Sequence, residues 1–192
     1  IIASGEGSTA EYVLDYILSE NGIDPETGVN ITYYTEHAEA ATALASAENA
    51  VAVLPQPFVT TVMNQDEGVS IALDLTDEWE KVTDGAQLVM GSIIGRNEYI
   101  EANPEAVSAF LDEYAASTDF VNNNVEEAAA LSESYDLFPA AVASKAIPNC
   151  NIVFMEGEEM KASAESFLQI MYDYEPSTVG GTLPGDDFYF AR

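Results

Sequence analysis

The chain has 192 residues with 34 acidic and 5 basic side chains, a net charge of −29, and this charge argues against a nucleic-acid or anionic-membrane partner. Hydrophobic residues make up 47% of the chain, which is enough for a folded core and excludes a disordered acidic tail. One cysteine and one histidine cannot form an intrachain disulfide and are too few for a Cys/His zinc site, so we expect no metal and no cofactor.

Strand and helix signals alternate from the first residue. Residues 1–4 are apolar enough for a strand, and the run from Ser8 to Glu11 matches a capping box in which Glu11 returns to the Ser8 N–H. The apolar spacing predicts a helix as far as Glu20, stopped by Asn21 and Gly22.

The same alternation continues to residue 75 and predicts a parallel sheet with right-handed crossovers. The expected strands are 31–34, 50–54 and 69–75, and the expected helices run from a Thr35 N-cap to about 47 and from Pro57 at the first helical position to 65.

The second half of the chain predicts one strand, at 88–95, and then mainly helices. A long helix begins near Pro104, shorter ones cover 125–134 and 139–147, and a last one covers 158–173 before an irregular tail. These helices have apolar faces, but the segment offers few strands for them to pack on. They therefore either form a bundle of their own or pack on a sheet whose strands lie outside this sequence.

Three strand-to-helix junctions point to a binding site, because ligands bind beyond the carboxyl ends of parallel strands. Gly5 and Gly7 allow the backbone to approach a solute, and the amides of Ser8, Thr9 and Ala10 are expected to bind a carboxylate or sulfonate. The alternative is that the glycines only permit a tight turn. The candidate ligand-binding residues of the three junctions are Ser4, Gly5, Glu6, Gly7, Ser8, Thr9, Glu36, His37, Gln56, Pro57 and Phe58.

Four single residues each have two open interpretations. His37 is either a ligand contact or a surface histidine, and Gln56, which lies between two prolines, is either a rigid polar contact or ordinary turn chemistry. Trp79 either stacks on a flat ligand or packs at a domain junction, with packing favoured. Cys150 is either a small packed residue, which is favoured, or a nucleophile.

Several stretches together resemble the solute-binding proteins of bacterial ABC importers, of the sulfonate/nitrate/taurine and thiamine-pyrimidine type. They are SGEGSTAEYVLDYILSENGID, YYTEHAEAATALASAENAVAVLPQPFVTTV, GSIIGRNEYIEANPEAVSAFLDEYAAS and GGTLPGDDFY. The resemblance implies an α/β, two-lobe, periplasmic-binding-protein-like (type II) fold, with a parallel-sheet lobe and a helix-rich partial second lobe. We expect one lobe at 1–75, a hinge at 76–87 and part of the other lobe at 88–192, with the N-terminal part of the first lobe outside the sequence.

The resemblance also implies a non-enzymatic receptor that passes a small-molecule solute to ABC permease subunits. We expect a monomer, located outside the cytoplasm as a periplasmic protein or a cell-surface lipoprotein, with Ser8, Thr9, His37 and Gln56 touching the solute. Two alternatives remain open: the effector-sensing domain of a transcriptional regulator, and an enzyme of the pyrimidine-synthesis type. Lys81 and Arg96 are the only basic residues near the middle, so a neutral, zwitterionic or cationic heterocycle is at least as plausible as a sulfonate or nitrate.

Overall fold

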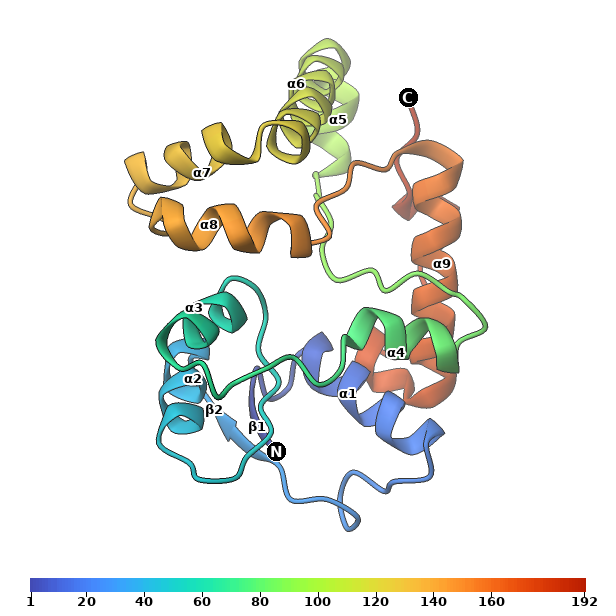
Figure 1. The fold of residues 1–192 in the computed structure, drawn as a ribbon. Helices are drawn as coiled ribbons and strands as arrows, with labels where there is room; N and C mark the ends of the chain where they lie inside the picture. Colours follow the sequence, from blue (N-terminus) through green and yellow to red (C-terminus); the bar gives the residue numbers. More distant parts are fainter. The chain divides into compact units, whose positions relative to one another are not determined.

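The computed structural model describes residues 1–192 and divides into two compact units (Figure 1). Unit 1 comprises Ile1–Met90 and Glu156–Ala191, and unit 2 comprises Gly91–Met155 with Arg192. The helix at residues 157–174 therefore packs with the N-terminal unit, whereas the expected division assigned all of 88–192 to one lobe. That division into lobes stays a prediction.

A small parallel sheet lies at the centre of the N-terminal part of unit 1. Strand β1 (Ile2–Ser4) pairs in parallel with β2 (Thr32–Tyr34), as the alternation predicts. On the other side of β1, a parallel bridge joins Ile2 to Ala52. The strand expected at 50–54 is thus reduced to a single bridge. Strand β1 lies in the middle, between β2 and the segment that contains Ala52.

Helix α1 (Thr9–Glu20) begins and ends where the sequence signals predict. Its end is a Schellman motif, in which the Ile23 N–H donates to the Leu18 carbonyl at 2.9 Å and the Gly22 N–H to the Ser19 carbonyl at 2.9 Å. Gly22 has a φ of +75°, a left-handed conformation that a glycine adopts without strain.

The next two helices start one residue later than predicted. Helix α2 (His37–Ala45) is capped at Glu36 rather than Thr35, because the Glu39 carboxylate reaches back to the Glu36 N–H at 3.4 Å. Helix α3 (Phe58–Gln65) has Pro57 as its N-cap and not as its first helical residue, since the Pro57 carbonyl accepts the Thr61 N–H at 3.0 Å.

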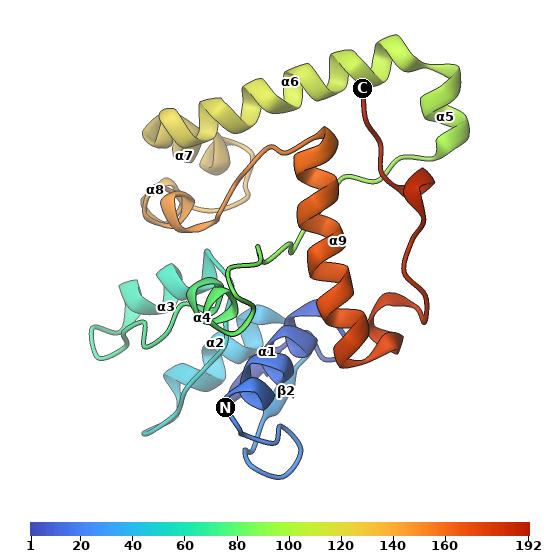
Figure 2. The same ribbon diagram turned by 90° about the vertical axis from the view of Figure 1, so that its right-hand side faces the viewer.

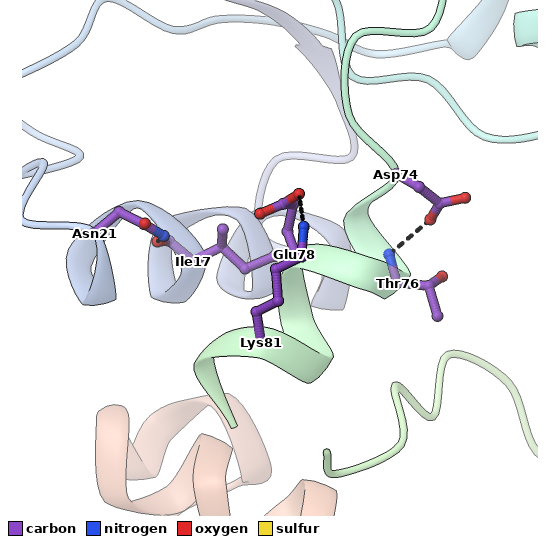
Figure 3. A network of polar contacts seen from close by, with 6 residues as sticks. All are labelled: Ile17, Asn21, Asp74, Thr76, Glu78 and Lys81. Carbon is purple, nitrogen blue, oxygen red and sulfur yellow. Dashed lines mark hydrogen bonds and ion pairs between the residues drawn. The ribbon is translucent and has the colours of Figure 1, made fainter. Parts of the chain in front are cut away.

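The strands expected at 69–75 and 88–95 are wrong. Residues 69–74 and 86–96 form no strand, because a strand needs a hydrogen-bonded partner and neither segment has one within residues 1–192. Helix α4 (Leu75–Val82) lies between these two segments, and at its start the Asp74 carboxylate accepts the Thr76 N–H at 2.8 Å (Figure 3).

The core of unit 1 is built around Trp79 of α4, which is 0% exposed. Helix α1, α4 and α9 (Gly157–Tyr174) lie side by side around it (Figures 1 and 2). The Trp79 ring lies 5.2 Å from the Tyr16 ring and 5.4 Å from that of Phe167. The packing interpretation of Trp79 is therefore confirmed, and stacking on a ligand is wrong because the ring has no accessible face. Short 3-10 turns at Pro176–Val179 and Asp186–Phe188 follow α9.

Unit 2 is helical, and three of its four α-helices fall where the sequence predicts helices, whereas the helix at residues 97–102 was not predicted. The four helices are α5 (Asn97–Ala102), α6 (Pro104–Asn123), α7 (Val125–Ser134) and α8 (Ala140–Ala146), followed by a 3-10 turn at Ile147–Asn149. Helices α7 and α8 run close together because buried alanines line both of them: Ala128, Ala129, Ala143 and Ala146.

Cys150 is half-buried beside this pair of helices, and its thiol donates to the Ala146 carbonyl at 3.2 Å. Burial raises the pKa of the thiol, which fits the packed rather than the nucleophilic interpretation. No helix in the structure is both long and apolar enough to cross a membrane.

Candidate functional site

The three strand-to-helix junctions meet at the carboxyl edge of the sheet in unit 1. Ser4, the last residue of β1, has its hydroxyl 2.5 Å from Nδ1 of His37, the first residue of α2. The His37 ring in turn lies 5.2 Å from the ring of Phe58, the first residue of α3, at an angle of 52°. Side chains from three separate connections are thus in mutual contact, as parallel-strand topology predicts.

The turn between β1 and α1 has the glycine geometry that the sequence predicts. Gly5 and Gly7 have φ values of +84° and +74°, which favour glycine. At Gly5 an added Cβ would lie 2.7 Å from the Ser8 hydroxyl oxygen, so the turn also closes tightly on its own N-cap residue.

The amides of this turn are largely used within the turn, contrary to expectation. The Ser8 N–H donates to the Gly5 carbonyl at 3.0 Å, and the Ala10 N–H donates to the Ser8 hydroxyl at 3.3 Å. The Glu11 carboxylate accepts the Gly7 N–H and not the Ser8 N–H, so the predicted capping box is wrong. Of the three amides expected to face a ligand, only that of Thr9 is left without an acceptor.

Gln56 is held in place by the helix that follows it. Its Oε1 accepts the Thr60 hydroxyl at 2.8 Å and the Thr60 N–H at 3.3 Å, and Thr60 is itself 7% exposed. The side-chain oxygen is therefore used to secure the start of α3, whereas the NH2 group of Gln56 takes no part in these two bonds.

Accessibility differs among the predicted site residues. Ser4 is buried at 7% exposed and its hydroxyl contacts His37. The exposed residues are Glu6, Gly7, Thr9, Glu36 and His37, and the half-buried ones are Gly5, Ser8, Gln56, Pro57 and Phe58. A shallow groove starts at the second junction and follows α2, lined by Tyr34, Ala38, Glu39, Thr42, Ala43 and Ser46.

Sequence reasoning missed two residues at this edge. Thr60 could have been found, because it lies four residues after Gln56, in the first turn of α3, where its N–H and hydroxyl can reach the Gln56 side chain. Tyr33 of β2 carried no sequence signal. Its hydroxyl is buried without a hydrogen-bond partner, and burial, followed by the negative charges of Asp15, Glu11 and Glu6, raises its pKa.

A family model described as the NMT1-like family matches residues 2–134. The chain belongs to the NMT1-like family. The resemblance to ABC-importer substrate-binding proteins of the sulfonate/nitrate type is thereby confirmed. A search of curated proteins found no match.

A solved structure has the same fold as this NMT1-like chain. It is the 1.75 Å crystal structure of an ABC transporter from Parabacteroides distasonis, which superposes with a TM-score of 0.75 at 22% identity. The match covers 100% of the present chain but 66% of that protein, so the NMT1-like chain spans less than two thirds of its length. The predicted α/β fold of a binding protein is confirmed by this match.

Proposed function

We propose that the chain is the solute-binding receptor of an ABC importer, acts outside the cytoplasm and carries out no chemical reaction on its solute. The solute binds at the edge formed by the three junctions of unit 1. Tighter binding to a closed form of the protein shifts an open–closed equilibrium, and the closed form docks on the permease.

The observation that carries the proposal is the chain of contacts from Ser4 through His37 to Phe58. It gathers three helix starts at the carboxyl edge of a parallel sheet, in a chain of the NMT1-like family. Gln56 and His37 present polar atoms there, on backbones fixed by α3 and α2. Location as a periplasmic protein or surface lipoprotein, and action as a monomer, are parts of the same proposal.

Calorimetry tests the site. The compound that co-purifies with the protein is first identified by mass spectrometry and then titrated into His37→Ala and Gln56→Ala. Each variant loses one hydrogen bond to the solute, so we expect affinity to fall about tenfold or more. Gln65→Ala, at the far end of α3, is the matched control and should bind like the natural protein. Unchanged affinity in both site variants would refute the assignment.

A further inference from the structure

The charge of the solute can be inferred from how the site's own groups are paired. An anion at a helix start needs free backbone N–H groups. In the turn after β1 the N–H groups of Gly7, Ser8 and Ala10 already donate to the Glu11 carboxylate, the Gly5 carbonyl and the Ser8 hydroxyl. A carboxylate of the chain itself takes up the Gly7 N–H, and among the Ser8, Thr9 and Ala10 amides only that of Thr9 is left without an acceptor.

Negative side chains surround the edge at two of the three junctions. Glu6 and Glu11 lie at the first junction, and Glu36 and Glu39 lie at the second, where Glu39 caps its own helix. Negative charge at these two junctions disfavours a solute with a sulfonate or carboxylate group and favours a positively charged solute.

No lysine or arginine of unit 1 is available to offset this charge. The two lysines of unit 1 are bound elsewhere, Lys81 to Glu78 at 2.7 Å and Lys161 to Asp186 at 2.6 Å. Figure 3 shows the first of these pairs on α4. The terminal amino group of Ile1 donates to the Asn30 carbonyl at 2.6 Å, at the opposite end of β1.

The remaining groups suit a flat or apolar solute body. The rings of His37 and Phe58 stand 5.2 Å apart and are tilted at 52°, and the face of a phenylalanine ring attracts cations. Ser4 engages Nδ1 of His37, which leaves Nε2 as the ring nitrogen that can meet the solute.

From these contacts we infer that the site takes a small organic cation with an apolar or aromatic body and excludes sulfonates, carboxylates and nitrate. The inference rests on the proposed function, because it names the class of solute bound at the same edge.

Three probes with the same benzyl body test the inference: benzylammonium, benzyl alcohol and phenylmethanesulfonate. Each is titrated into the 15N-labelled protein while the resonances of Thr9, His37 and the Gln56 side chain are followed by NMR. We expect benzylammonium to bind about tenfold or more tightly than the sulfonate, and its affinity to fall as salt is raised.

Glu11→Gln is the decisive variant, because the glutamine oxygen can still accept the Gly7 N–H while the charge is removed. We expect this variant to weaken benzylammonium about threefold to tenfold and to leave benzyl alcohol unchanged. Glu20→Gln, at the far end of the same helix, is the control and should bind all three probes like the natural protein.

The outcomes separate the inference from the proposed function. If phenylmethanesulfonate binds more tightly than benzylammonium and shifts the same resonances, the site stands and the inference about charge is overturned. If Glu11→Gln leaves the affinity for benzylammonium unchanged, the inference is also overturned. If none of the probes shifts these resonances, the inference is overturned, and the proposed function is then decided separately by calorimetry with the co-purifying compound.

Discussion

Two carboxyl groups at or near α1, Asp15 and Asp24, have pKa values that the fold shifts in opposite directions. Burial, followed by repulsion from Glu11 and Glu26, raises the pKa of the Asp15 carboxyl, so the folded state holds its ionised form unfavourably. Asp24, just beyond α1, is the opposite case. Hydrogen bonds from the Thr27 hydroxyl and the Glu26 N–H lower its pKa, so this exposed carboxylate is favoured in the fold.

We predict that Asp15→Asn raises the free energy of unfolding at pH 7. The pKa of Asp15 is higher in the folded state, so ionisation destabilises the fold above that pKa and has no effect below the unfolded value near 4. The gain should stay below about 1 kcal/mol, because the side chain is partly exposed and solvent screens its charge. Urea unfolding at pH 7 and pH 3 measures it. The two proteins should have equal stability at pH 3, and a less stable variant at pH 7 would contradict the argument.

At the scale of the element, the end of α1 depends on the backbone of a single residue. We predict that Gly22→Ala destabilises the protein by about 1 kcal/mol, because the residue must keep a φ of +75° and the left-handed region strains a residue with a Cβ. An added Cβ would meet no atom within 4 Å, so the cost comes from the backbone and not from a clash. Thermal unfolding measures it, and Gly22→Asn is the matched control with a smaller expected loss. Equal losses for both variants would indicate a different cause.

Local signals explain which elements were predictable. The helices α1, α6, α7 and α9 follow from caps, prolines and apolar spacing that lie within each segment. Local signals do not decide whether residues 69–75 and 88–95 form strands, because strand formation depends on a partner segment that is distant in sequence. Ile71 and Ile94 remain 57% and 83% exposed in these two segments, so an apolar pattern alone did not create a strand.

The candidate site was predictable in its position but not in its bonding. Parallel topology is enough to bring the three junctions to one edge, and the contact between Ser4 and His37 bears this out. The pairing of the turn's amides was not predictable, because the Glu11 carboxylate can reach either the Ser8 or the Gly7 N–H and the choice depends on the glycine conformations. That choice carries the inference that the solute is a cation.

At the scale of the whole molecule, the two units have different kinds of core. In unit 1, large side chains pack around Trp79, the only tryptophan of the chain. In unit 2, the buried apolar residues are alanines between α7 and α8. Tryptophan fluorescence therefore reports unfolding of unit 1, while far-UV circular dichroism reports the helices of both units.

We predict that Met171→Ala lowers the fluorescence midpoint of unit 1, because it removes a side chain that is 2% exposed and leaves a cavity beside Trp79. The free energy of unfolding should fall by roughly 3 kcal/mol.

Ala129→Leu in α7 is the complementary variant in unit 2. Ala129 is 1% exposed, so a larger side chain overpacks this core and should lower the free energy of unfolding by about 1–3 kcal/mol. Urea unfolding is followed by tryptophan fluorescence and by circular dichroism. Met171→Ala should shift the fluorescence transition to lower urea, whereas Ala129→Leu should leave it in place and shift only part of the dichroism transition. If each variant shifts both signals equally, the units unfold as one cooperative body, because a loss confined to one core would then be transmitted in full to the other.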